Sequence, residues 1–410
     1  MFFLSGIVFA KLGLPLSEIA LYETVLFASS AVSHFWVNGI TSSLLSLYPS
    51  IRENKEDLFS NAFLLITAIS LAFVAVLYIM HSLGIPFFKS TDSLYFFIFI
   101  LYFFLTAPSF LIEYILLLKG KTKDLLGLTV VSGLMHIVFV IIPVIHWHNI
   151  RYSIFGLLIV AILRYLILLY YLLKGKKLVW DKGLAWAVLK LALPLITATL
   201  VGGSTEYIDV FMVNHLFNSS AFAIYRYGAK ELPLTLLLAN ALSSSLVPLL
   251  SEEEGSQNLE ILKNKSLRLM HFLSPLAIAL MLMSKWLYST LLSPAFLGSA
   301  IIFSTYLLLV PSRLVFPQTI LLGRQQAKLI MNFAIIEVIL NISFSYILAL
   351  HFGIAGIAMG TVIAFTMDKV FQAFIVYKYY RILPSEYISL KPFFTYSVLL
   401  LATYILIMAT

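Results

Sequence analysis

The stretch STEYIDVFMVNHLFNSSAFAIYRYGAKE, residues 204–231, places ionisable side chains between two long apolar runs. The two runs meet at a polar turn near Phe217, which predicts a helical hairpin. A charged side chain in a bilayer core costs on the order of 3 kcal/mol, so each one needs a cavity, a partner or a membrane interface. The side chains that need this explanation are Glu206, Asp209, Arg226, Lys230 and Glu231.

The composition of the whole chain requires a lipid environment. Of its 410 residues, 61% are hydrophobic and 11% are charged, with a mean hydropathy of +0.99, whereas soluble domains carry roughly 25% charged residues. The net charge of +8 comes largely from basic residues scattered over short loops, so we expect no nucleic-acid partner. The sequence contains no cysteine, which excludes disulfides, thiol catalysis and cysteine-bound metals.

Long apolar runs divide the chain into membrane-spanning segments. They are continuous rather than alternating, which predicts helices and not a β-barrel. The run MFFLSGIVFA, residues 1–10, is too short to span a bilayer, and we interpret it as the end of a first helix that begins upstream. We therefore predict an all-α polytopic membrane protein with about thirteen transmembrane helices. After the first, they fall at 20–48, 58–81, 94–118, 125–146, 153–173, 185–214, 219–249, 267–290, 296–322, 328–350, 354–377 and 393–409.

Basic residues are distributed unevenly between alternate loops, and this bias predicts the orientation. With a cytoplasmic N-terminus, 17 lysines and arginines fall in inside loops and 4 in outside loops. We therefore expect a multi-pass protein whose N-terminus is cytoplasmic.

Three short matches at nearly one offset suggest an internal repeat. EIALYETV (18–25) resembles AFAIYRYG (221–228), which aligns Tyr22 with Tyr225, and SIFGLL (153–158) resembles GIAGIA (353–358). LLKGKTKDLL (117–126) also resembles LLGRQQAKLI (321–330). We predict two parallel six-helix bundles with a substrate site between them. The predicted domains are 1–175, a linker at 176–184, 185–380, and an additional helix at 391–410.

Two longer stretches carry a family resemblance. LALPLITATLVGGSTEYIDVFMVNHLFNSSAFAIYRYGAKELPLTLLLANALSSSLVPLLSE (191–252) and its N-half counterpart KLGLPLSEIALYETVLFASSAVSHFWVNGITSSLLSLYPS (11–50) resemble polysaccharide (O-antigen-type) flippases of the multidrug/oligosaccharidyl-lipid/polysaccharide exporter superfamily. The shared pattern is a proline-containing helix, an aspartate late in it, a tyrosine motif opening the next helix, and a proline before the loop. The other fold with six-plus-six helices, the major facilitator type, requires a signature that YPSIRENKEDLF (48–59) lacks.

The resemblance implies a MATE-like fold and a secondary transporter rather than an enzyme. Such flippases move undecaprenyl-pyrophosphate-linked oligosaccharides across the bacterial inner membrane by alternating access, coupled to Na⁺ or H⁺. The implied partners are the lipid-linked oligosaccharide, the bilayer and polysaccharide polymerase or assembly proteins, with no cofactor.

The hairpin at 204–231 brings acids and bases to matched depths. At 1.5 Å per residue, Asp209 and Arg226 reach similar depths in the outer half, and Glu206 and Lys230 do so one turn deeper. Two interpretations stay open: an ion-pair ladder that fixes helix register, or an outer gate or cation site in which Asp209 changes partner. We expect Asp209 to pair with Arg226.

A second set of charges lies in the cytoplasmic half. Arginine forks match phosphate oxygens, so a pyrophosphate-linked substrate favours a cavity role for the deep bases; for Lys190 the alternative is snorkelling toward the interface. Asp368 and Lys369 are adjacent, so we expect them to point to different sides of their helix. The candidate substrate-binding residues are Arg164, Lys190, Arg313 and Lys369, near the acids Glu113, Glu337 and Asp368.

Weaker candidates complete the set. Related lipid II flippases are thought to hold sodium in their C-terminal half, and this resemblance implies that Asn332, Asn341 and Thr361 supply oxygen ligands to a coupling cation together with Asp209 and Glu337; interhelical hydrogen bonding is the alternative. For the intramembrane histidines His34 and His136, the choice is between a hydrogen-bonded interior position and proton coupling.

Several functions are disfavoured by what the sequence lacks. It contains no Walker loop, G-x-S-x-G elbow or H-E-x-x-H metal motif, which argues against ATP hydrolysis in this chain. The remaining alternatives are a cation-coupled drug antiporter of the same superfamily and a membrane enzyme of glycan assembly, although the chain shows neither the sizeable extracytoplasmic loop nor the catalytic histidine motif that such an enzyme needs.

Overall fold

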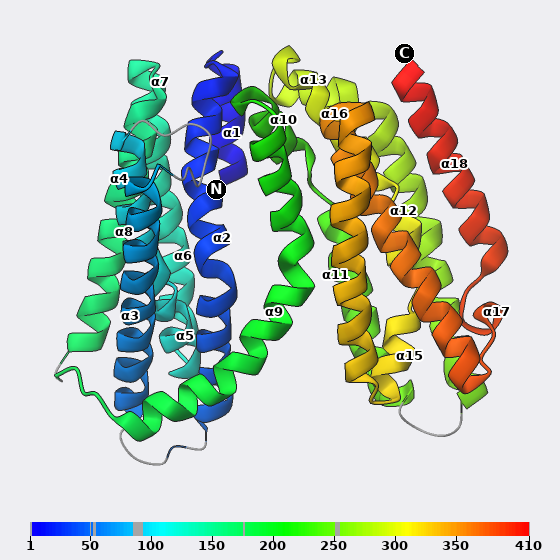
Figure 1. Ribbon diagram of the computed structural model, residues 1–410, viewed down its shortest axis with the longest axis horizontal. Helices are drawn as coiled ribbons and strands as arrows, with labels where there is room; N and C mark the ends of the chain where they lie inside the picture. Colours follow the sequence, from blue (N-terminus) through cyan, green and yellow to red (C-terminus); the bar gives the residue numbers. More distant parts are fainter. Residues whose placement is uncertain are drawn as a thin grey trace. The chain divides into compact units, whose positions relative to one another are not determined.

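The computed structural model describes residues 2–49, 51, 55–84, 93–174, 177–250 and 255–409, with the side chains of 2, 3, 201, 202, 206, 255 and 256 left out. Every regular element in these ranges is a helix (Figure 1). The predicted all-α membrane fold is therefore confirmed.

The chain divides into two compact units, residues 1–200 and 201–410. This division falls inside one long helix, α9 (Lys182–Leu216), downstream of the linker expected at 176–184. The domain boundaries expected from the sequence stay predictions.

The first unit is a bundle built from continuous apolar segments. Three of the expected spans correspond to single helices, α2, α3 and α8, while two are interrupted: α4 and α5 break at Phe110, and α6 and α7 are separated by a π-helical turn, η1. Apolar side chains on the facing sides of these helices are fully buried, including Phe59 and Phe103. The helices are α1 (Phe2–Lys11), α2 (Leu16–Leu47), α3 (Lys55–Ser82), α4 (Ser93–Ser109), α5 (Leu111–Leu118), α6 (Thr122–His136), η1 (Ile137–Ile141), α7 (Ile142–Trp147), α8 (Ile150–Leu173) and the start of α9.

The π-helical turn is stabilised by its neighbour α8. Its wider hydrogen-bond spacing leaves backbone groups to be satisfied from outside, and the hydroxyl of Ser153 donates to the carbonyl of Val140 at 2.7 Å. Gly156 allows the two backbones to approach, because a Cβ there would lie 1.8 Å from the carbonyl oxygen of Phe139.

We expect Gly156→Ala to lower the stability of the protein by about 1–3 kcal/mol, because the added methyl group meets backbone that cannot rotate away. Gly127→Ala is the matched control: Gly127 is also helical but has open space around its Cβ position, so alanine should stabilise by up to about 1 kcal/mol. Thermal unfolding of the purified variants measures both. Equal stability of the two variants would contradict the close packing.

The second unit contains the end of α9 and ten further elements. Its core is apolar, and Leu262, Leu273 and Leu314 are among the fully buried side chains. The elements are α10 (Ser219–Gly228), α11 (Pro233–Leu250), α12 (Gly255–Leu291), η2 (Pro294–Phe296), α13 (Leu297–Leu307), α14 (Val310–Arg313), α15 (Pro317–Gly323), α16 (Ala327–Tyr380), α17 (Pro384–Tyr387) and α18 (Leu390–Ala409).

Helix α16 is a helical hairpin whose arms, 327–352 and 354–380, meet at Gly353 (Figure 1). Gly353 adopts φ 62° and ψ −144°, a conformation that glycine reaches without steric cost. Beyond the turn, a Cβ on Gly356 would lie 2.1 Å from the carbonyl oxygen of Leu348. The sequence repeat aligns Gly156 with Gly356. In its own unit, each glycine allows its helix to approach the backbone of the preceding helical segment closely.

Among the described residues, nine helices are long and apolar enough to cross a membrane, or ten if the bent pair 294–307 and 310–323 forms one span. The hairpin α16 counts once in that number although it contains two of the predicted segments. The total of about thirteen stays a prediction.

Candidate functional site

Asp209 on α9 is the most buried carboxylate described in the second unit, and it is surrounded by neutral donors. Its side chain is 0% exposed. Its Oδ2 accepts hydrogen bonds from the hydroxyls of Tyr225 at 3.4 Å, Tyr306 at 3.2 Å, and Thr361. Its Oδ1 accepts from Nδ2 of Asn341 at 3.1 Å.

The hairpin of α16 assembles half of this site. Asn341 lies on the first arm and Thr361 on the second, with 3.0 Å between Nδ2 and Oγ1. Between them and the turn, the hydroxyl of Ser345 donates to the carbonyl of Ile357 at 3.0 Å. Turning the arms at Gly353 is thus what places two oxygen-bearing side chains beside Asp209.

The side chains around Asp209 carry oxygen atoms of the kind that bind cations. In the arrangement seen, the carboxylate is saturated by hydrogen bonds, while Oδ1 of Asn341 is buried and accepts none from the described residues. Hydroxyl groups can turn so that a lone pair rather than the proton points inward. The same four neighbours can therefore stabilise an ionised carboxylate or contribute oxygen ligands with it.

The predicted pairing of Asp209 with Arg226 is wrong. The neighbouring residue Tyr225 is fully buried and occupies the carboxylate, while Arg226 is half-buried on another face of α10. Hydroxyl donors satisfy the carboxylate without a second charge. Lys230 is exposed, and the side chain of Glu206 lies outside the described residues, so the pairing of these two stays a prediction.

A second polar cluster in this unit contains Arg313 on α14. Its guanidinium binds Glu231 through two hydrogen bonds, Nε to Oε2 at 2.9 Å and Nη2 to Oε1 at 2.5 Å. The Cζ atom also lies 3.8 Å from the ring centre of Phe365. Arg313 is thus a paired and stacked side chain in this conformation.

Lys369 lies in the same cluster, on the second arm of α16. Its Nζ is 3.1 Å from Oδ2 of Asp368 and 3.3 Å from Oε1 of Gln318. The expectation that Asp368 and Lys369 point to different sides is wrong, because the four-carbon stem of lysine reaches around the helix to its neighbour. Glu337, half-buried on the first arm, interacts electrostatically with both and with Arg313.

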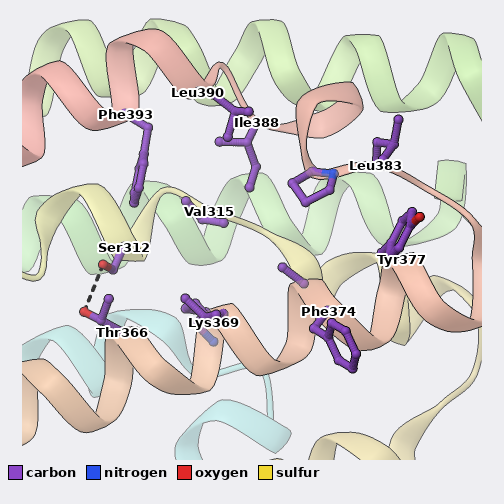
Figure 2. A pocket seen from close by; sticks show the side chains of 13 residues that line it. Ser312, Val315, Thr366, Lys369, Phe374, Tyr377, Leu383, Ile388, Leu390 and Phe393 are labelled. Atoms are coloured by element: carbon purple, nitrogen blue, oxygen red, sulfur yellow. Dashed lines mark hydrogen bonds between the residues drawn. The ribbon is translucent and has the colours of Figure 1, made fainter.

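An apolar pocket of about 460 Å³ opens beside this cluster (Figure 2). Ser312 and Thr366 are hydrogen-bonded at its wall, 3.2 Å apart. Lys369 lines it, although its ammonium group is bound to Asp368. The remaining lining is Val315, Val370, Ala373, Phe374, Tyr377, Leu383, Pro384, Ile388, Leu390 and Phe393.

In the first unit, Arg164 on α8 pairs with Glu113 on α5 at 2.7 Å. The pair lines a cavity of about 260 Å³ whose wall is partly polar and partly apolar, together with Tyr102, Thr129 and His136. The Nε of Arg164 is buried and has no hydrogen-bond partner among the described residues. Because this nitrogen is buried, a ligand in the cavity would reach it only after a movement of the surrounding side chains.

His136 takes the hydrogen-bonded interior position, with Nε2 2.7 Å from the hydroxyl of Ser5 and 3.4 Å from that of Tyr22. His34 is exposed. Tyr22 and Tyr225, which the sequence repeat aligns, are both fully buried. The hydroxyl of Tyr22 contacts His136, and that of Tyr225 contacts Asp209.

Other candidates lie apart from these sites. Lys190 is exposed near the start of α9, and Asn332 is exposed on the first arm of α16. Within the described ranges, no group of three or more histidine, aspartate or glutamate side chains could hold a metal ion.

Three important partners were missed by sequence reasoning: Glu231 for Arg313, Tyr306 for Asp209, and Gln372, whose Nε2 donates to Asp368 at 2.7 Å. Tyr306 and Glu231 pair with residues about 80 or more positions away, and no periodic pattern reports such a contact. Gln372 is one helical turn after Asp368, a spacing that could have indicated it.

Comparison with known proteins identifies the family. A family model described as polysaccharide biosynthesis protein matches residues 11–254, and no curated protein sequence matches. Among solved structures, the lipid II flippase MurJ in an inward closed conformation is similar, with TM-score 0.74, 18% identity, and coverage of 100% of this chain and 90% of that chain.

Two further structures have the same fold. An inward-facing MATE family multidrug transporter of the MOP superfamily gives TM-score 0.62 at 12% identity, covering 97% of this chain and 94% of that one. A MATE transporter of Vibrio cholerae gives 0.56 at 13% identity, covering 93% and 92%. These likenesses confirm the predicted MATE-like fold, and because the family model spans more than half of the sequence, the chain belongs to the polysaccharide biosynthesis protein family.

Proposed function

We propose that the protein is a flippase that moves an undecaprenyl-pyrophosphate-linked oligosaccharide across the bacterial inner membrane by alternating access. The observation that carries the proposal is the cavity beside Arg164 and Glu113 in the first unit. An arginine–glutamate pair inside a membrane-spanning bundle is expensive, and an arginine that lines a cavity together with a tyrosine and hydroxyl groups suits a substrate rich in hydroxyls or phosphate oxygens.

The apolar pocket of the second unit supports the lipid part of the substrate. Its 460 Å³ falls within the size of ordinary ligand pockets, roughly 300–1,000 Å³. Branched and aromatic side chains line it, as an isoprenoid chain would require. A lipid-linked oligosaccharide needs hydrogen-bonding groups for its sugars and phosphates and an apolar surface for its lipid. The cavity beside Arg164 offers the first, and the pocket of the second unit offers the second.

Roles for the remaining charges follow from their partners. Arg313 and Lys369 are held by acids, so contact with a pyrophosphate requires each to exchange its partner during the cycle. Lys190, exposed on α9, would contact headgroups. Glu206, Arg226 and Lys230 remain candidates for an outer gate.

Energy for the cycle would come from a cation gradient acting at Asp209. Its oxygen-rich surroundings can hold Na⁺ or accommodate H⁺. The sequence analysis grouped Glu337 with Asp209, but Glu337 interacts with Lys369 and Arg313 instead. It would influence the coupling of cation and substrate movement through that cluster.

Orientation belongs to the same proposal: the N-terminus would be cytoplasmic. Cysteine introduced at exposed Lys123 should resist a membrane-impermeant thiol reagent in intact cells, while cysteine at exposed Ala295 should react. The reverse pattern would invert the assignment.

Transport by purified protein in vesicles tests the function. We expect a fluorescent polyprenyl-pyrophosphate oligosaccharide to cross, and Arg164→Gln to slow it about 10-fold or more, the effect of losing a charge-assisted hydrogen bond of about 1.5–3 kcal/mol. Arg151→Gln, at an exposed arginine on the same helix, should transport normally. Movement of a cationic dye but not of the glycolipid would favour the antiporter alternative.

A further inference from the structure

We propose that Glu113 makes the cavity of the first unit select a sugar ring of the substrate and reject its pyrophosphate. Glu113 lies on α5 and pairs with Arg164 on α8, with 2.7 Å between Oε1 and Nη2. Both side chains line the cavity. The inference rests on the proposed function and deepens it, because it assigns one part of that substrate to one group of side chains.

The carboxylate is the more open member of the pair. The side chain of Glu113 is 44% exposed and that of Arg164 is 23% exposed, and Nε of Arg164 is buried. A ligand in the cavity therefore has more of the acid than of the base within reach. With histidine counted as neutral, these two are the charged side chains among the described lining residues, so the cavity offers an anion no excess positive charge.

The pair matches sugar hydroxyls better than a phosphate group. A carboxylate only accepts hydrogen bonds and a guanidinium only donates them, whereas a hydroxyl does both. Two neighbouring hydroxyls of a sugar can thus donate to Glu113 and accept from Arg164 at the same time. A phosphate group brings acceptor oxygens and negative charge, so it gains no hydrogen bond from Glu113 and is repelled by it.

The rest of the wall suits the same ligand. Tyr102 and Phe110 contribute aromatic rings, and Thr129 and Ser132 contribute hydroxyl groups. The C–H groups of a sugar ring pack against aromatic faces, which carry partial negative charge. The volume of about 260 Å³ lies just below that of ordinary ligand pockets, roughly 300–1,000 Å³, so the cavity accommodates a single ring rather than an oligosaccharide chain.

An ion pair can also serve only to tie α5 to α8, and the variant Glu113→Gln separates the two roles. Glutamine keeps an acceptor for Arg164, but it removes the charge that repels phosphate and weakens the hydrogen bond to a sugar hydroxyl. A tie between helices changes the amount of folded protein and so affects every ligand equally. Selection by Glu113 changes the preference between ligands.

Competition in the vesicle assay measures this preference. Transport of the fluorescent glycolipid is followed while either the unlabelled glycolipid or polyprenyl pyrophosphate without sugar is added. We expect the glycolipid to compete better in the parent protein, and Glu113→Gln to reduce the ratio of the two inhibition constants about 10-fold, the effect of losing one charge-assisted hydrogen bond. Asp124→Asn, at an exposed acid on α6 outside the cavity, should keep the parent ratio. An unchanged ratio in Glu113→Gln would leave the pair as a tie between helices and overturn the proposal.

A cysteine in the cavity tests the same point without altering Glu113, and it decides the matter if Glu113→Gln does not fold. The chain contains no cysteine, and Thr129 is exposed and lines the cavity. In Thr129→Cys, the glycolipid should slow the reaction with maleimide, and polyprenyl pyrophosphate should not. Lys123→Cys, at an exposed position on the same helix, should react equally in all samples.

The remaining outcomes are distinguishable. Equal protection of Thr129→Cys by both compounds would overturn the proposal. Protection by phosphatidylethanolamine in place of phosphatidylglycerol in the nanodisc would also overturn it, because the ligand would then be a membrane lipid. If the parent protein does not move the glycolipid, the proposed function fails and this inference fails with it. Transport of the glycolipid with an unchanged ratio would overturn the inference alone.

Discussion

Replacing Asp209 by asparagine is expected to reduce transport about 10–100-fold without loss of protein yield. The substitution keeps the size of the side chain but removes the charge that Tyr225, Tyr306 and Thr361 stabilise by hydrogen bonds. Losing a charged acceptor costs about 1.5–3 kcal/mol, which corresponds to this range at about 1.4 kcal/mol per tenfold change.

The decisive measurement is transport as a function of Na⁺ concentration and of pH. If Asp209 binds the coupling cation, the variant should lose dependence on that cation. Glu260→Gln, at an exposed glutamate of α12, is the matched control and should behave like the parent. Unchanged transport and unchanged cation dependence in Asp209→Asn would remove Asp209 from the coupling machinery.

Replacing Arg313 by glutamine should lower stability by about 3–5 kcal/mol, because it leaves Glu231 as an unpaired, largely buried charge. The double variant Arg313→Gln with Glu231→Gln should recover most of the loss, since neither charge then remains. Arg313→Lys should be intermediate: a lysine keeps the charge but not the two-point fork or the flat stacking on Phe365.

Thermal unfolding and membrane yield measure this effect, and Arg268→Gln on an exposed face of α12 is the control. The same variants also separate structure from transport. If the double variant regains stability but not transport, Arg313 has a role beyond pairing with Glu231. If Arg313→Gln alone is as stable as the parent, the paired arrangement is not what holds α14 in place.

The sequence predicted the helices well because a bilayer imposes simple rules on them. A run of about 20 apolar residues must form a helix there, and the expected spans at 328–350 and 354–377 are the two arms of α16 on either side of Gly353. The turn between the arms falls at Gly353, because glycine adopts that conformation without strain.

Side-chain pairing was harder to predict because depth alone does not decide it. Asp209 and Arg226 were matched in depth, yet Tyr225 and Tyr306 supply the donors. Rotation about the helix axis, which depends on packing against distant segments, selects between such candidates. The flexibility of long side chains adds a second uncertainty about which partner they reach. Lys369, for example, binds its sequence neighbour Asp368.

The hairpin at Gly353 has a thermodynamic consequence for Asp209. Asn341 stands on one arm and Thr361 on the other, and both bind the same carboxylate. If Asp209 binds the coupling cation as proposed, a change in the angle between the arms alters its affinity for that cation. Linkage is reciprocal, so a bound cation must bias that angle by the same free energy, and a small ion would act on two long helices through a single hinge.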